Sequence, residues 1–137
     1  MHMPSITAGY LAILALLYAV LALQVIRLRL SNQTAFNDGG NSGLRSAIRA
    51  HGNFMEYMPI IALMVALIEM SGTPPVRIHL LMGALLVSRL LHPLGMYAAL
   101  NSPMFLICRG GGILITIGLL VSCAVTVLAR LMAGTMG

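Results

Sequence analysis

The sequence predicts an all-α fold, an integral membrane bundle of four helices, and two observations lead to this prediction. Of the 137 residues, 59% are hydrophobic and only 8% are charged, whereas soluble domains average roughly 25% charged residues. The apolar residues gather in four segments, each with the roughly 20 residues that a helix needs to cross about 30 Å of hydrocarbon. Strands are excluded because an open sheet edge would leave backbone groups unpaired in lipid.

The four segments form a single predicted domain over residues 1–137. Their approximate bounds are residues 6–26, 46–71, 76–100 and 105–132. The first segment is long and has no basic stretch before it, so we expect a retained helix rather than a cleaved signal peptide. The mean hydropathy of +0.96 over the whole chain agrees with four spans joined by short connections.

The three connections differ in composition. Residues 31–43 are polar and rich in glycine, which predicts a mobile loop. Residues 71–75 contain two adjacent prolines that end one helix and start the next, which predicts a tight turn. Residues 101–103, with the sequence NSP, mark the last turn.

The charged residues favour a membrane protein over a nucleic-acid-binding protein. The net charge is +5, but the eight basic residues, all arginines, are dispersed through apolar sequence. More of them flank the first and third connections than the second, so the positive-inside rule predicts cytoplasmic first and third connections and external termini. The two cysteines have no nearby metal-type ligands, and we expect neither a disulfide nor a metal site.

One face of the second predicted helix carries charge that lipid would not tolerate. At about 100° per residue, Arg45, Arg49, Asn53 and Glu56 fall within a sector of about 80°, with Tyr57 at its edge. A charge inside a membrane span is costly unless it is paired or wet, so it is a functional hypothesis by default. We interpret this face as the wall of a polar cavity of ligand size.

The third predicted helix also contains polar residues within apolar sequence, namely Arg89, His92 and Tyr97. Counted from the cytoplasmic side, Glu56 and Arg89 both lie roughly 15 Å deep, so an ion pair between them is expected. Two interpretations of the pair remain open, a ligand-binding role and a structural lock between helices. For His92, a cavity position and a satisfied core position are equally open.

Three further features have alternative interpretations. Arg27, at the end of the first predicted helix, is either an interface anchor or a ligand-binding residue. Arg109 and the three glycines after it open the fourth predicted helix, where free backbone N–H groups would suit an anion, or the glycines would allow close helix packing. Glu69 is expected to be solvated, and His51, off the polar face, is expected to pack in the core.

These residues resemble the MAPEG family, the membrane-associated proteins in eicosanoid and glutathione metabolism. Residues 49–59, RAHGNFMEYMP, resemble the second-helix signature of that family. Residues 24–29, residues 89–97 and Arg109 are similar to weaker family motifs on the other helices. The sequence departs from the eukaryotic members at Met96, where they have a tyrosine, because Tyr97 is displaced by one residue.

The resemblance implies a homotrimer that binds glutathione between neighbouring protomers, near the cytoplasmic side. Arginines would hold the carboxylates of the tripeptide, and Glu56 would hold its amino group. Arg109 is similar in place to a fourth-helix arginine that stabilises the glutathione thiolate, so it is the candidate catalytic residue. The candidate glutathione-binding residues are Arg27, Arg49, Asn53, Glu56, Tyr57, Arg89, His92 and Tyr97.

The predicted function is therefore a glutathione-dependent transferase or peroxidase that acts on lipophilic electrophiles arriving from the bilayer. We expect a multi-pass protein of a bacterial inner membrane, with its active site toward the cytoplasm. Two alternatives come from other classes of protein. A small multidrug or proton-coupled transporter would use a membrane glutamate, although arginines on the same face would repel a cationic substrate. A non-catalytic scaffold would use the buried charges only to fix helix register.

Overall fold

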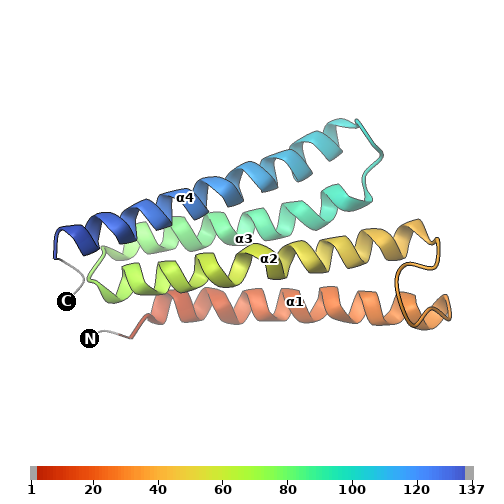
Figure 1. Cartoon of the computed structure of the whole chain (residues 1–137), viewed down its shortest axis with the longest axis horizontal. Helices are drawn as coiled ribbons and strands as arrows, with labels where there is room; N and C mark the ends of the chain where they lie inside the picture. The colour runs from red at the N-terminus through yellow and green to blue at the C-terminus, as the bar shows by residue number, and fades with distance from the viewer. Residues whose placement is uncertain (1–2, 135–137) are drawn as a thin grey trace.

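The computed structural model describes residues 3–134 and shows four long antiparallel helical rods in that part of the chain (Figure 1). The elements are α1 (Ser5–Ser31), α2 (Ser42–Met70), α3 (Pro75–Tyr97), and a π-helical segment η1 (Phe105–Gly110) that continues into α4 (Gly111–Met132). All four rods are long and apolar enough to cross a membrane. The predicted all-α, four-helix membrane fold is confirmed.

The helix ends differ from the predicted bounds because polar capping residues extend a helix beyond its apolar span. α1 continues to Ser31, five residues past the predicted end, and includes Arg27. α2 starts at Ser42, because the Asn41 side chain accepts a hydrogen bond from the Leu44 N–H at 2.9 Å. Such a cap satisfies a backbone donor that has no partner within the helix.

Both described chain ends lie at one end of the bundle, and the α1–α2 and α3–α4 connections lie at the other (Figure 1). The second predicted turn is confirmed as the short link between α2 and α3. We call the end with the two longer connections the loop end. Five arginines lie in the half of the bundle nearer the loop end, as the sequence pattern predicted: Arg27, Arg29, Arg45, Arg49 and Arg109.

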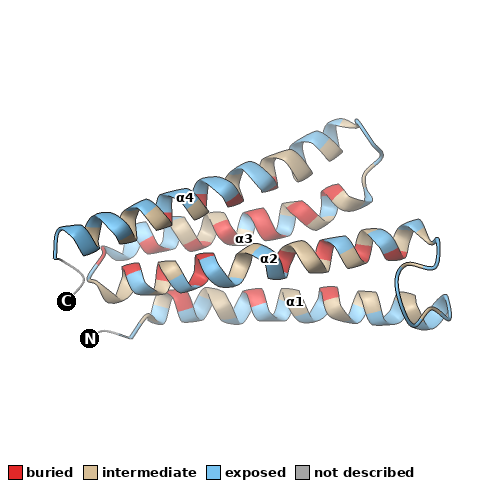
Figure 2. Cartoon of the chain, viewed as in Figure 1, coloured by how far each residue is buried: buried red, intermediate tan, exposed pale blue. Residues whose placement is uncertain are grey.

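The helices pack in chain order, and α4 covers α2 and α3 without contacting α1. α1 buries only Thr7, Leu14 and Leu21, spaced seven residues apart like the seam of a coiled coil. The core between α2 and α3 includes Ile61 and Met82, both 0% exposed. Many of the remaining apolar residues are exposed, coloured pale blue in Figure 2, as expected where lipid or another protomer covers them.

Two glycines allow α3 to approach the fourth rod closely near the loop end. A Cβ added at Gly95 would lie 2.6 Å from the Arg109 backbone nitrogen, and one at Gly112 would lie 3.3 Å from the His92 Cβ. The close-packing interpretation is therefore confirmed for Gly112. A Cβ at Gly118 would meet nothing within 4 Å, so Gly118 does not mark a close approach between helices of this protomer.

Glu69 caps a neighbouring helix, so the prediction that it is solvated is wrong. Its carboxylate accepts hydrogen bonds from the Ile6 N–H and the Thr7 N–H, both at 2.9 Å, and from the Thr7 hydroxyl at 2.6 Å. Thr7 is 1% exposed. The C-terminal turn of α2 thus supplies the negative charge that the N-terminus of α1 favours, and it joins the two helices at the end opposite the loops.

Replacing Glu69 with glutamine should lower the free energy of unfolding by about 1.5–3 kcal/mol, the range for hydrogen bonds to a charged group. The amide keeps the size of the side chain, but it removes the negative charge and one of the two acceptor oxygens. The melting temperature of the detergent-solubilised protein measures the effect. Asp38→Asn is the matched control, because it removes a half-buried loop carboxylate whose only ionic partner is the exposed Arg45 side chain, and it should change stability by less than about 0.5 kcal/mol. Equal melting temperatures for the two variants would contradict the capping role.

Candidate functional site

A hollow of about 280 Å³ lies between α2, α3 and the start of the fourth rod, and we call it the polar cavity. Six of the nine candidate site residues line it: Arg49, Asn53, Glu56, Tyr57, His92 and Arg109. The remaining lining residues are Ile48, Gly52, Met96 and Ile113. The polar face predicted from the periodicity of the second helix thus faces a cavity, as expected.

The positions along each helix explain how the charged side chains meet. Arg49, Asn53 and Glu56 are spaced by four and three residues, which places them on one face of α2. Arg109 comes from η1, where its guanidinium carbon lies 5.2 Å from the centre of the Phe105 ring. This cation–π contact holds the guanidinium beside an apolar surface.

Arg109 does not lie at a helix start, so the predicted backbone anion site is wrong. The fourth rod begins at Pro103, and the Phe105 N–H is capped by the Ser102 hydroxyl oxygen at 3.1 Å. The Gly111 N–H already donates to the carbonyl of Ile107. Any contribution of this segment to anion binding therefore comes from the Arg109 side chain. A π-helical turn widens the helix locally and is frequent at functional sites.

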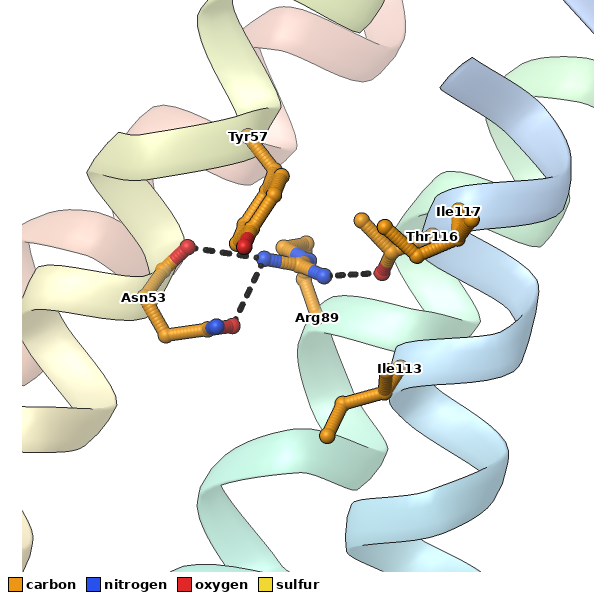
Figure 3. A pocket seen from close by; sticks show the side chains of 6 residues that line it. All are labelled: Asn53, Tyr57, Arg89, Ile113, Thr116 and Ile117. Carbon is orange, nitrogen blue, oxygen red and sulfur yellow. Dashed lines mark hydrogen bonds between the residues drawn. The ribbon is translucent and has the colours of Figure 1, made fainter. Parts of the chain in front are cut away.

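The predicted ion pair between Glu56 and Arg89 is also wrong. Arg89 is only 2% exposed, and its nearest acceptors are uncharged (Figure 3). It donates to the backbone and side-chain oxygens of Asn53, both at 3.0 Å, and to the Thr116 hydroxyl. Asn53 faces α3 and reaches Arg89, whereas Glu56, on the next turn of α2, is exposed at the rim of the polar cavity. Within residues 3–134, Asp38 and Arg45 form the one ion pair.

A second hollow of about 100 Å³ lies beside the Arg89 guanidinium, and we call it the deep cavity. The deep cavity and the polar cavity adjoin, because they share three lining residues: Asn53, Tyr57 and Ile113. The other lining residues of the deep cavity are Arg89, Thr116 and Ile117. Nothing in the sequence indicates that Thr116 accepts a hydrogen bond from Arg89.

The two membrane histidines differ in their surroundings. His51 stacks on Tyr18 of α1, with ring centres 4.7 Å apart, but it is half-buried, so it packs between helices without lying in the core as predicted. His92 lines the polar cavity and is 4% exposed, and no described residue forms a hydrogen bond to its Nδ1 atom. A buried ring nitrogen without a partner is costly unless water or a ligand supplies one. The cavity position, rather than the satisfied core position, fits this geometry.

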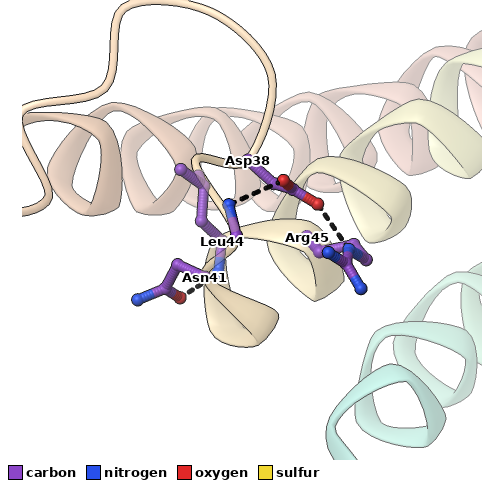
Figure 4. Close-up of polar contacts among 5 residues, drawn as sticks. Asp38, Asn41, Leu44 and Arg45 are labelled. Atoms are coloured by element: carbon purple, nitrogen blue, oxygen red, sulfur yellow. Dashed lines mark hydrogen bonds and ion pairs between the residues drawn. The ribbon is translucent and has the colours of Figure 1, made fainter.

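Three residues that the sequence placed at the site or on the polar face do not line the polar cavity of the protomer: Arg27, Arg45 and Tyr97. Arg27 is exposed on α1, which lies away from the fourth rod, and Tyr97 is 47% exposed at the end of α3. Arg45, predicted on the polar face, instead pairs with Asp38 of the α1–α2 connection (Figure 4). Hydropathy and periodicity do not reveal which arginine a loop carboxylate will reach.

The α1–α2 connection, predicted to be mobile, is held by side-chain hydrogen bonds. The Asn41 amide donates to the Asn32 side-chain oxygen at 2.9 Å, and the Arg29 guanidinium donates to the Ala35 carbonyl at 2.9 Å. The pKa of the Asp38 carboxyl lies below its ordinary value, mainly because the Arg45 side chain donates a hydrogen bond to it. Asp38 therefore stays ionised at neutral pH, and the pair weakens only as the pH falls through that lowered pKa.

The fold and the cavity define an integral, multi-pass membrane protein with a polar, arginine-lined hollow between its helices. The MAPEG family model matches residues 7–129, and the chain belongs to this family. The chain is 39% identical over 92 residues to the inner membrane protein YecN of Escherichia coli strain K12, a match that covers 67% of this chain and 70% of the relative. The corresponding protein of Escherichia coli O6:H1 gives the same values. No solved structure matches the chain.

Proposed function

We propose that this protein is a glutathione-dependent transferase or peroxidase that acts on lipophilic electrophiles from the bilayer. The observation that carries the proposal is the convergence of Arg49, Arg109 and Glu56 on one cavity of about 280 Å³. Glutathione has two carboxylates, one ammonium and a thiol, so two guanidiniums and one carboxylate complement its charges. The volume lies near the lower end of the roughly 300–1,000 Å³ of small-molecule sites.

Glu56 supports this assignment over a purely structural one. It is exposed at the cavity and has no ion-pair partner among the described residues. A scaffold that used Glu56 to fix helix register would pair it within the bundle. A carboxylate left open beside guanidiniums is instead suited to a ligand ammonium, and these same guanidiniums disfavour the cationic substrates of a multidrug transporter.

The position of Arg109 supports the chemistry. It lines the polar cavity and also another hollow of about 360 Å³ on the outer surface of the helix bundle. The other residues of this outer hollow are Phe105, Leu106, Gly110 and Ile113. A guanidinium beside the ligand sulfur favours the thiolate, which is the attacking nucleophile. In a transfer reaction the sulfur forms a bond to the electrophilic carbon while the leaving group departs with its electron pair. The outer, largely apolar hollow offers a lipophilic substrate a path to that sulfur.

Assembly and location form part of the same proposal. The exposed face of α1 and the open rim at Glu56 favour a homotrimer in which Arg27 of one protomer reaches the cavity of the next. The MAPEG likeness supports this arrangement. The arginine-rich loop end favours a cytoplasmic active site, and the name of the relative, an inner membrane protein, supports an inner-membrane location.

Glutathione should stabilise the detergent-solubilised protein in a thermal-shift titration. A ligand that binds only the folded state stabilises it by RT ln(1 + [L]/Kd), about 2.7 kcal/mol at 100 times Kd. Glutathione diethyl ester is the matched control, because it retains the peptide but neutralises both carboxylates, and it should bind much more weakly. An unchanged melting temperature at millimolar glutathione would contradict the proposal.

Replacing Glu56 with glutamine should weaken glutathione binding roughly 10- to 100-fold, which corresponds to a charged hydrogen bond of about 1.5–3 kcal/mol. The melting temperature of the free protein should not change, because Glu56 is exposed and unpaired within the described chain. Calorimetric titration measures the affinity. N-acetylglutathione lacks the ammonium and should bind wild type and variant equally. If the variant loses affinity for both ligands alike, Glu56 does not contact the amino group.

A further inference from the structure

The buried charge of Arg89 has no anionic partner in the part of the chain that the structure describes. The sequence contains three acidic residues: Asp38 pairs with Arg45, Glu69 caps α1 at the opposite end, and Glu56 is exposed at the cavity rim. A guanidinium that is 2% exposed is costly to bury without an opposite charge. The hollow beside it is lined by Asn53, Tyr57, Thr116 and two isoleucines, with no carboxylate among them.

The free polar groups around this hollow are hydrogen-bond donors. Arg89 has five N–H groups, and its four hydrogen bonds to Asn53, Thr116 and Ser88 leave one N–H without an acceptor. The Thr116 hydroxyl donates to the Gly112 carbonyl at 2.7 Å, so toward Arg89 it only accepts. Among the described residues, neither the Tyr57 hydroxyl nor the Asn53 amide nitrogen has a hydrogen-bond partner. Figure 3 shows both side chains turned toward the guanidinium.

We propose that the deep cavity binds one small monovalent anion, a halide ion or a single carboxylate group. The side chains with a free donor, Arg89, Tyr57 and Asn53, line a space without any anionic group, and the apolar isoleucines strengthen the attraction between the guanidinium and an anion. The volume of about 100 Å³ accommodates such an anion with a water molecule. Because the deep and polar cavities share Asn53, Tyr57 and Ile113, the carboxylate can also belong to a ligand in the polar cavity.

The first test uses the detergent-solubilised protein without glutathione, so it does not depend on the proposed function. Its melting temperature is measured in sodium chloride and sodium bromide against sodium camphorsulfonate at constant ionic strength, because camphorsulfonate has no carboxylate and its rigid cage keeps the anionic group out of the deep cavity. We expect a saturable rise of several degrees with either halide. In Tyr57→Phe, which removes one donor and keeps the ring, half-saturation should require at least about five times more halide. Arg45→Gln, which removes an exposed arginine, should respond like wild type.

The second test distinguishes the two sources of the anion. Glutathione affinity is measured at increasing bromide concentration. If bromide weakens glutathione binding, a glutathione carboxylate occupies the deep cavity, and if it does not, the site binds a free halide. Either result supports the anion site. Equal melting temperatures in halide and camphorsulfonate would overturn it. A halide effect that does not saturate and is identical in Tyr57→Phe would overturn it as well. A halide effect without any glutathione binding would retain the anion site while removing the proposed function.

Discussion

Replacing Gly95 with alanine should destabilise the protein by about 1–3 kcal/mol, the typical cost of overpacking, and should also displace Arg109. The new Cβ would lie 2.6 Å from the Arg109 backbone nitrogen and 2.9 Å from its Cβ. Neither atom belongs to a flexible side-chain end, so α3 and η1 must separate. Because Arg109 lines the polar cavity, this separation should weaken glutathione binding and catalysis in addition to lowering the melting temperature.

Gly83→Ala is the matched control for this variant, because Gly83 lies in the same helix. Its added Cβ would meet the Tyr10 hydroxyl at 3.7 Å, an ordinary contact. Alanine favours a helix over glycine by roughly 0.5–1 kcal/mol at either position. Thermal unfolding and glutathione titration of both variants separate the steric cost from that gain. If Gly95→Ala melts at or above the temperature of Gly83→Ala, the close approach does not constrain the site.

The fold was predictable because membrane helices satisfy their backbone groups within one segment. The four spans therefore follow from apolar length alone, without any knowledge of which helices touch. The polar face of α2 was predictable for a related reason, since a period of 3.6 residues fixes which side chains share a face. Arg49, Asn53 and Glu56 accordingly line one cavity.

Contacts between helices were not predictable in the same way. Equal depth placed Glu56 and Arg89 at one height, but depth says nothing about rotation about the helix axis. Asn53 faces α3 and takes the hydrogen bonds of Arg89. Glu69 was misjudged for a similar reason, because its partner Thr7 lies 62 residues away in the sequence.

No sequence pattern indicates the π-helical turn of the fourth rod. The segment after the third connection was predicted as an ordinary helix, whereas Phe105–Gly110 forms a π-helix beside Gly95. The run of glycines after Arg109 suggested a helix start, although the capping residue is Ser102, seven positions earlier. A serine followed by a proline is a recognised helix-start signal, so the start of the fourth rod at Pro103 has a sequence signal whereas the π-helical turn has none.

Replacing Arg109 with leucine should lower the turnover of a lipophilic electrophile roughly 10²- to 10³-fold at neutral pH, the usual cost of losing one donor that stabilises a developing or reacting anion. Glutathione affinity should stay within a few-fold of wild type, because Arg49 and Glu56 remain in the cavity. The fraction of bound glutathione present as thiolate should fall, since the guanidinium that favours the charged sulfur is gone.

Ultraviolet absorbance of the bound thiolate across pH, combined with steady-state turnover of 1-chloro-2,4-dinitrobenzene, separates the possible roles of Arg109. Loss of affinity with an unchanged thiolate titration would instead assign Arg109 to a ligand carboxylate. Arg109→Lys keeps the charge without the planar fork and should restore part of the thiolate signal. Arg77→Leu is the matched control, because that arginine hydrogen-bonds to Thr126 near the opposite end of the bundle. If the thiolate titrations of wild type and Arg109→Leu coincide, the guanidinium does not act on the sulfur.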